Sequence, residues 1–216
     1  MISAASAARR ESRADLRDVV LGLGSATLHE AAGQIGALPS EIMTRTPSLL
    51  LVGRAFPVAC PPADNFWLHR AVYAAEPGDV IVASVGGAYE AGYWGEVLSC
   101  AARSRGLAGL VIDGGVRDQA RLPEMGVPVF SRRVCMRGTT KARTGHGRLK
   151  APVTIGEVVI RHGDLVVGDQ DGVLVLPADR VDSVVDAAQQ RSHKEAEFMT
   201  KIMAGESTLD LYGLDR

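Results

Sequence analysis

The run Gly109–Ile112 constrains the fold of this 216-residue chain most, because it is apolar throughout. A strand with one face in water alternates apolar and polar residues, whereas a strand in a helix-covered parallel sheet is apolar on both faces. A second strand is predicted at Val80–Val85, and apolar residues recur at helical spacing in Trp67–Ala75 before it and in Ala91–Arg105 after it. This alternation of helices and strands predicts an α/β fold.

Two further helices and several short strands complete the prediction. The segment Ala14–Ile35 has helical spacing interrupted by glycines, so we expect a second helix within it that Ser25 or Thr27 caps. The segment Asp179–Met203 predicts one long amphipathic helix. Short strands are predicted at Leu49–Val52, Pro128–Ser131, Val153–Ile155, Glu157–Ile160, Leu165–Val167 and Val173–Leu176. Because no linker separates the halves, we expect residues 1–216 to form a single domain.

Composition excludes several classes of protein. Hydrophobic residues make up 46% of the chain, which is enough to build a core and excludes global disorder. The 24 Lys and Arg residues nearly balance the 25 Asp and Glu residues, so the net charge of -1 favours neither nucleic acid nor an anionic membrane as a partner. No apolar run is long enough to span a bilayer, and we expect no signal peptide because Met1–Arg17 lacks an apolar core. Since Cys60, Cys100 and Cys135 are typical of reduced thiols, we expect a cytoplasmic protein.

Residues suited to chemistry are densest just before the second predicted helix and just after the buried strand. Gly95 lies near a helix start, where the backbone N–H groups from Gly95 through Leu98 can bind an anion. Arg117 and Asp118 follow the carboxyl end of the buried strand, and ligands bind at the carboxyl ends of strands in open α/β sheets. Arg117 can clamp a carboxylate, and Asp118 offers the hard oxygen ligands that Mg²⁺ or Mn²⁺ takes. Taken alone, however, an adjacent Arg-Asp pair is more often a surface ion pair.

A longer pattern contains these residues. Gly92-Tyr93-Trp94-Gly95-Glu96 is followed, after twenty residues, by Arg117-Asp118. This resembles the RraA-like family, whose class II 4-hydroxy-4-methyl-2-oxoglutarate / 4-carboxy-4-hydroxy-2-oxoadipate aldolases carry an acid, twenty positions and then Arg-Asp. The resemblance also covers Ser25–Thr27, Val111–Gly114, Pro128–Phe130, Pro152–Gly156, Gly163–Val167 and Asp169–Pro177. It therefore extends over most of the chain.

The resemblance implies an architecture and a reaction. The fold would be α/β, of the swivelling phosphohistidine-domain type, with helices packed on mixed sheets in a single domain. The chain would assemble as a homotrimer or as a hexamer (a dimer of trimers), with active sites between subunits. Aldolases of the family use a divalent cation, Mg²⁺ or Mn²⁺, to cleave a 2-oxo acid carrying a 4-hydroxyl into pyruvate and a second 2-oxo acid. They also decarboxylate oxaloacetate, because both reactions pass through a pyruvate enolate.

The resemblance also implies a role for each matching residue. Arg117 would bind the substrate and offset the negative charge of the enolate. Asp118 would be the protein ligand of the metal, and Glu96 would position or deprotonate a water molecule that takes the 4-hydroxyl proton. The pyruvyl carboxylate would be held by the backbone amides of Gly95, Glu96, Val97 and Leu98.

Several positions leave alternatives open. Glu96 stands where the aldolase pattern has Asp, so its carboxylate reaches about 1 Å further, a displacement that can cost ~100-fold in rate. The family also uses an acid from the neighbouring subunit's C-terminal helix, for which Glu195 and Glu197 are candidates. Asp113 is a candidate to orient Arg117.

Two other functions compete with the aldolase. One is a non-enzymatic regulator that binds a ribonuclease; such members of the family tend to have an acid where this chain has Arg121, which argues against that branch. The other is a lyase that acts on a different 2-oxo acid in the same site.

Overall fold

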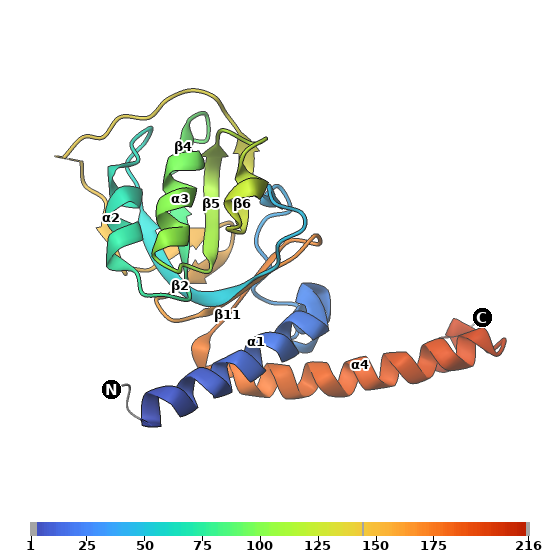
Figure 1. Ribbon diagram of the computed structural model, residues 1–216. Coiled ribbons are helices and arrows are strands. Elements are labelled where there is room, and N and C mark those ends of the chain that lie inside the picture. Colours follow the sequence, from blue (N-terminus) through green and yellow to red (C-terminus); the bar gives the residue numbers. More distant parts are fainter. Residues whose placement is uncertain (1–3, 144, 215–216) are drawn as a thin grey trace.

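The computed structural model describes residues 4–143 and 145–214, with side chains described from Leu16 onward. The helices are α1 (Ala4–Ala31), α2 (Phe66–Ala74), α3 (Glu96–Ser104), α4 (Val181–Met203) and α5 (Thr208–Tyr212), with the short 3₁₀ turns η1 (Leu122–Met125) and η2 (Ala178–Arg180). The strands are β1 (Met43–Thr44), β2 (Leu51–Ala59), β3 (Asp79–Ser84), β4 (Gly92–Trp94), β5 (Gly109–Val116), β6 (Val129–Val134), β7 (Arg148–Leu149), β8 (Val153–Ile155), β9 (Val158–Ile160), β10 (Leu165–Gly168) and β11 (Val173–Leu176). Figure 1 shows a body built on one sheet, from which α4 extends.

The sheet is mixed, as the family resemblance implied. Its main strand order within the described residues is β1-β6-β5-β3-β2-β10-β11, with β4 paired to β5 and β7 to β2. The central neighbours β2, β3, β5 and β6 run parallel, whereas β1 and the pair β10 and β11 add antiparallel edges. The predicted α/β class is confirmed, and β2 is longer than the predicted strand Leu49–Val52 because its pairing with β3 continues through Ala59.

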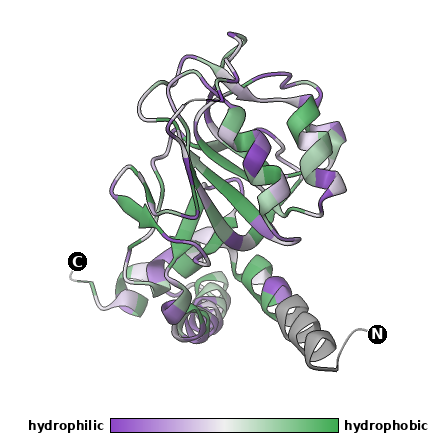
Figure 2. Cartoon of the chain, turned by 90° about the vertical axis from the view of Figure 1, so that its left-hand side faces the viewer, coloured by the Kyte–Doolittle hydropathy of each residue, from purple (hydrophilic) through white to green (hydrophobic). Residues whose placement is uncertain are grey.

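The strand β5 lies at the centre of the core. All eight of its residues are buried, which confirms that the apolar run Gly109–Ile112 has no solvent-exposed face. On one face of the sheet, side chains such as Leu68 and Leu98 from α2 and α3 pack against Phe56 and Leu110. On the other face, a second cluster joins the central strands to the β8–β9 hairpin. The apolar strands therefore lie enclosed within the body (Figure 2).

The N-terminal helix is broken where the glycines predicted a break. Gly24 has non-helical backbone angles, with φ 78°, inside α1. The side chain that caps the second half of α1 is that of Asp169, which is distant in the sequence, and not that of Ser25. Both the backbone N–H and the hydroxyl of Ser25 donate to the carboxylate of Asp169, at 2.7 and 2.6 Å. This tie fastens α1 to the turn between β10 and β11.

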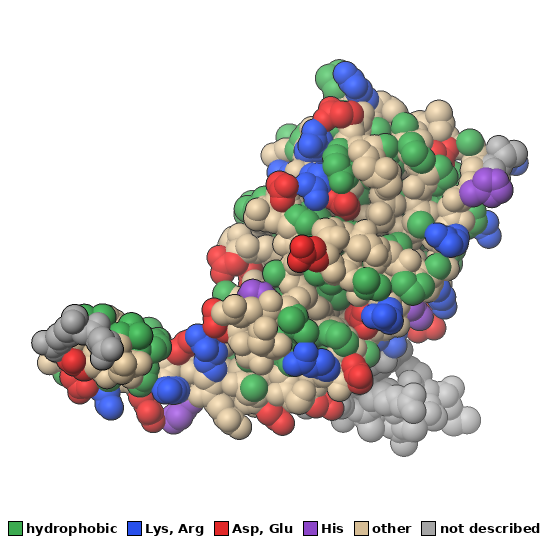
Figure 3. All heavy atoms as spheres, turned by 180° about the vertical axis from the view of Figure 1, so that it is seen from behind, with side chains coloured by type: hydrophobic (Ala, Val, Ile, Leu, Met, Phe, Trp, Pro, Cys, Tyr) green, Lys and Arg blue, Asp and Glu red, His purple; other side chains and the backbone are tan. Residues whose placement is uncertain are grey.

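The C-terminal helix leaves the body. The first half of α4 packs against α1 and the strands through Val181, Val184, Val185 and Ala188. Its far end projects away from the sheet (Figure 1). Exposed apolar side chains gather on this projecting end (Figure 3), namely Met199, Ile202, Met203, Leu209, Tyr212 and Leu214. Among the described residues, no helix is both long and apolar enough to cross a membrane.

Candidate active site

The spacing between Glu96 and Arg117 follows from a strand–helix–strand unit. The predicted helix Ala91–Arg105 is wrong at its start, because Gly92–Trp94 forms β4 and α3 begins only at Glu96. The strand β4 pairs in parallel with the end of β5, with Gly92 opposite Gly115. The twenty intervening residues are taken up by α3, the turn after it and β5. Because β4 and β5 are parallel, both end at the same edge of the sheet.

Glycines allow these two strand ends to approach. A Cβ at Gly115 would lie 2.5 Å from the carbonyl oxygen of Ala91 and 3.0 Å from Cβ of Cys135. A Cβ at Gly95 would overlap the carboxylate of Asp118 and lie 3.0 Å from Cγ of Arg117. Residue 95 must therefore be glycine for Asp118 to reach the start of α3.

Asp118 binds the first residue of α3 directly. Its Oδ2 accepts a hydrogen bond of 3.0 Å from the backbone N–H of Glu96. The Asp118 backbone has φ 58°, in the left-handed region that residues other than glycine rarely adopt. This turn carries the carboxylate back over the end of β4. Such outliers cluster at functional sites and support the prediction that Asp118 belongs to one.

Arg117 lies on the same edge. Its backbone N–H donates to the carbonyl oxygen of Trp94 at 2.8 Å, which fixes the end of β5 against β4. Its Nε lies 3.8 Å from Oδ2 of Asp118, and its side chain is 46% exposed. The structure thus brings Glu96, Arg117 and Asp118 together with their side chains accessible to a small molecule.

The backbone N–H groups that follow Gly95 differ in whether they have a hydrogen-bond partner. The N–H of Glu96 donates to Asp118, so it is already partnered within the chain. The amides of Val97 and Leu98 belong to the first turn of α3, whose N–H groups have no partner inside the helix. The Leu98 side chain is buried in the core, whereas that of Val97 is exposed.

The donor set at Asp118 fits a divalent cation bound through one protein carboxylate. Within the described residues, Oδ1 of Asp118 accepts no hydrogen bond, and the side chain is 38% exposed. No group of three or more His, Cys, Asp or Glu residues in the described part of the chain is placed to share a metal ion. A single carboxylate suits Mg²⁺, which usually retains several waters and binds through one or two carboxylates plus substrate oxygens.

Arg121 is a fourth charged residue at this edge. The turn after β5 brings its backbone N–H to the carbonyl oxygen of Asp118 at 2.8 Å. Its guanidinium lies 3.8 Å from Oε1 of Glu96 and 2.8 Å from Oε2 of Glu124. From the sequence, Arg121 served only to argue against the ribonuclease-binding branch of the family. No sequence signal placed it beside Glu96, because that approach depends on the left-handed backbone turn at Asp118.

Asp113 does not orient Arg117, so that hypothesis is wrong. Its carboxylate accepts a short hydrogen bond from Nε of Arg132 on β6, because β6 lies next to β5 in the sheet. Arg132 also pairs with Glu41 at 3.0 Å and stacks on the ring of Tyr89. Although burial opposes it, these hydrogen bonds raise the pKa of Arg132. The network ties β5, β6 and the segment before β1 together; it is buried at Asp113 and exposed at Glu41.

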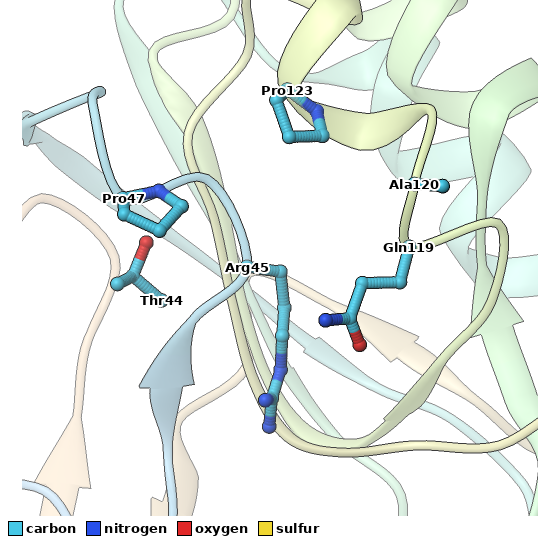
Figure 4. A pocket seen from close by; sticks show the side chains of 6 residues that line it. All are labelled: Thr44, Arg45, Pro47, Gln119, Ala120 and Pro123. Atoms are coloured by element: carbon cyan, nitrogen blue, oxygen red, sulfur yellow. The ribbon is translucent and has the colours of Figure 1, made fainter.

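An open hollow of about 440 Å³ adjoins the loop after Asp118. It is lined by Thr44, Arg45, Pro47, Gln119, Ala120 and Pro123. The side chains of Arg45 and Gln119 approach each other across it (Figure 4). Arg45 donates from Nε to the hydroxyl of Ser131 at 2.7 Å and from Nη2 to its carbonyl oxygen at 2.8 Å. Two donors of Arg45 are therefore committed to β6.

The candidate acids of α4 lie far from this edge within one chain. Figure 1 shows α4 on the opposite side of the body from the strand ends that carry Glu96 and Asp118. On that helix Glu195 pairs with Arg191 at 2.8 Å, and Glu197 pairs with His193 at 3.4 Å. A role for Glu195 or Glu197 in catalysis thus requires a second subunit and remains a prediction.

The fold and the site define a mixed α/β protein with an acid and an Arg-Asp pair at adjoining strand ends. A family model described as RraA-like (Aldolase/RraA) matches residues 14–175. A protein of Halalkalibacterium halodurans provisionally named 4-hydroxy-4-methyl-2-oxoglutarate aldolase is 35% identical over 167 residues, covering 76% of this chain and 77% of the relative. The chain belongs to the RraA-like family.

Solved structures agree with this assignment. A protein of Pseudomonas syringae, described as uncharacterized, matches with a TM-score of 0.80 at 28% identity, covering 92% of each chain. RraAS2 of Streptomyces coelicolor, described as an unusual member of the RNase ES inhibitor RraA protein family, matches with a TM-score of 0.67 at 27% identity. That match covers 83% of this chain and 93% of RraAS2. The predicted family and fold class are therefore confirmed.

Proposed function

We propose that this protein is a divalent-metal-dependent aldolase that cleaves 4-hydroxy-4-methyl-2-oxoglutarate-type 2-oxo acids to pyruvate and a second 2-oxo acid, and that it also decarboxylates oxaloacetate. The observation that carries the proposal is the hydrogen bond from Glu96 N–H to the Asp118 carboxylate, with Arg117 beside it. This contact brings the predicted acid Glu96 and the predicted metal ligand Asp118 together, with Arg117 beside them, at one edge of the sheet. The aldolase relative supports a lyase at the level of the family.

The site separates binding of the pyruvyl half from proton transfer. In this proposal the pyruvyl carboxylate lies at the start of α3, where the free first-turn amides and the helix dipole favour an anion. Arg117 donates to the same half of the substrate. Asp118 holds the divalent cation, Mg²⁺ or Mn²⁺, which when bound supplies Lewis-acid polarisation of the 2-oxo group.

Glu96 is the acid–base group. It takes the proton of the 4-hydroxyl, directly or through a water molecule, as the bond between C3 and C4 breaks. C4 becomes the carbonyl carbon of the second 2-oxo acid, and the electron pair of the broken bond forms the enolate of pyruvate. Arg117 offsets the charge of that enolate. A proton returned to C3 completes pyruvate, and loss of CO₂ from oxaloacetate leads to the same enolate.

The test is pyruvate release by the wild-type protein. It is measured with 4-hydroxy-4-methyl-2-oxoglutarate and with oxaloacetate, first with Mg²⁺ or Mn²⁺ and then with a chelator. We expect release from both substrates that the chelator abolishes. Release from oxaloacetate alone would indicate an intact enolate site with a different 2-oxo acid as the aldol substrate.

Absence of release from either substrate would contradict the proposal. It would favour the second class of function, a binding protein of the kind that the likeness to RraAS2 suggests. A ribonuclease-binding assay would then take precedence over further substrates.

A further inference from the structure

Two arginines lie among the acids of the edge that carries Glu96. Arg117 lies 3.8 Å from Asp118, and Arg121 lies 3.8 Å from Glu96 and 2.8 Å from Glu124. Under the proposed function Arg117 binds the pyruvyl half of the substrate, which leaves Arg121 as the arginine of this edge for a second carboxylate.

The position of Arg121 relative to Glu96 indicates which part of a substrate it meets. Under the proposed function, Glu96 acts on the hydroxyl of C4. A carboxylate attached to C4 is one bond away from the carbon that bears this hydroxyl. The side chain that binds it must therefore lie beside Glu96, and the guanidinium beside Glu96 is that of Arg121.

Arg121 is free to take such a ligand. Its side chain is 55% exposed, and its separation of 3.8 Å from Glu96 is longer than a hydrogen bond. Its Nη1 is held by Glu124 at 2.8 Å, so the end of the guanidinium that faces Glu96, Nη2, remains available. Exposed ion pairs of this kind are weak, so a substrate carboxylate can displace them.

We propose that Arg121 is a specificity-determining residue, which binds the carboxylate on C4 and selects 2-oxo acids with a second carboxylate over those without one. This inference rests on the proposed function. The C4 carboxylate keeps its charge throughout the cleavage, so Arg121 binds substrate and transition state equally. It therefore lowers KM for the dianion and has little effect on kcat.

The experiment compares two substrates that differ at one group. They are 4-hydroxy-4-methyl-2-oxoglutarate and 4-hydroxy-4-methyl-2-oxopentanoate, in which a methyl group replaces the C4 carboxylate. Both release pyruvate and both need Glu96, so any influence of Arg121 on Glu96 cancels in the ratio of their kcat/KM values. We expect Arg121→Ala to raise KM for the dianion about 10- to 100-fold. It should lower the ratio by the same factor, and Arg121→Lys should retain part of the preference.

Two variants serve as controls. Arg103→Ala removes another arginine, whose Nη1 contacts the carbonyl oxygen of Met125 at 3.4 Å, and it should leave the ratio unchanged. Glu124→Gln releases Arg121 from its partner and should maintain or increase the preference for the dianion. An unchanged ratio in Arg121→Ala, with pyruvate still released, would overturn the inference and leave the aldolase intact.

A binding measurement decides the case in which the wild-type protein cleaves neither substrate. Calorimetry then compares 2-oxoglutarate with 2-oxopentanoate, which lacks the second carboxylate. Preferential binding of 2-oxoglutarate that Arg121→Ala abolishes would support recognition by Arg121 even though the aldolase proposal had failed. Equal binding of the two acids would overturn recognition by Arg121 as well.

Discussion

The carboxylate of Asp118 and the backbone N–H of Glu96 are joined by a hydrogen bond of 3.0 Å across 22 positions of the sequence. The bond ties the loop after β5 to the first turn of α3. It commits Oδ2 of Asp118 to the helix start, whereas Oδ1 accepts no hydrogen bond from the described residues. The two acids of the proposed site are therefore held in a fixed relation by the backbone, and the site depends on whatever keeps that contact.

Gly95 keeps this contact, so Gly95→Ala should break it. The added Cβ would overlap the Asp118 carboxylate and force it away from α3. We expect pyruvate release to fall about 100-fold, because the reactive groups are displaced by about 1 Å. The free energy of unfolding should fall by about 1–3 kcal/mol. Gly138→Ala is the matched control, since no atom lies within 4 Å of its Cβ position, and it should change neither quantity.

Arg117 is proposed to serve both binding and catalysis. Arg117→Ala should therefore raise KM and lower kcat together, with a loss in kcat/KM of roughly 30- to 1000-fold. Arg117→Lys should be intermediate, because an ammonium keeps the charge but cannot form two parallel hydrogen bonds. Steady-state kinetics with oxaloacetate measure both variants. An Arg117→Ala enzyme with the wild-type KM would show that Arg117 does not bind the substrate.

Glu96 is proposed to move the proton, and Glu96→Gln tests this with little change of shape. We expect kcat for the aldol substrate to fall by about 10²–10⁴-fold. Since the side chain is 43% exposed, the free energy of unfolding should change by no more than about 0.5 kcal/mol. Wild-type turnover in this variant would exclude Glu96 as the acid–base group. Glu96→Asp separately measures whether the extra methylene is accommodated.

The central features of the fold were predictable because their residue patterns are local. The apolar run that became β5 and the long amphipathic helix α4 follow directly from periodicity. The short strand β4 was missed because three residues carry too little periodicity, and only pairing with β5 makes them a strand.

The site was predictable in part. The family pattern predicts that Glu96, Arg117 and Asp118 belong to one site. The strand–helix–strand unit explains how residues so far apart in the sequence reach the same edge of the sheet. The partner of Asp113 was not predictable, because it depends on which strand lies beside β5. The approach of Arg121 to Glu96 depends on the backbone turn at Asp118, which no sequence pattern marked.

Asp64 should make the stability of the fold depend on pH. It is buried and accepts hydrogen bonds from the Thr140 hydroxyl and from the backbone N–H groups of Ala142 and Phe66. Although burial opposes it, these bonds hold the pKa of Asp64 below its ordinary value of 3.8. Its contribution is therefore fully present above pH 3.8 and is lost as the pH falls through the lower value of the folded protein.

The variant Asp64→Asn measures this contribution. We expect it to be less stable than the wild-type protein by about 1–3 kcal/mol at pH 7. The difference should narrow as the pH falls below 3.8, because the carboxylate takes up a proton first in the unfolded chain and then, at lower pH, in the folded protein. Urea unfolding at a series of pH values gives both quantities. A difference that stays constant down to pH 2 would mean that ionisation of Asp64 does not stabilise the fold.

The central claim is that Asp118 holds the divalent cation on which pyruvate release depends. The most direct measurement is the initial rate of pyruvate release from 4-hydroxy-4-methyl-2-oxoglutarate, with Mg²⁺ and with chelator, for the wild-type protein and for Asp118→Ala. The variant loses one helix-capping contact, worth about 1 kcal/mol, and should remain folded. The account predicts chelator-sensitive release by the wild-type protein and none above background by the variant. Release by folded Asp118→Ala at the wild-type rate, still dependent on Mg²⁺, would contradict it.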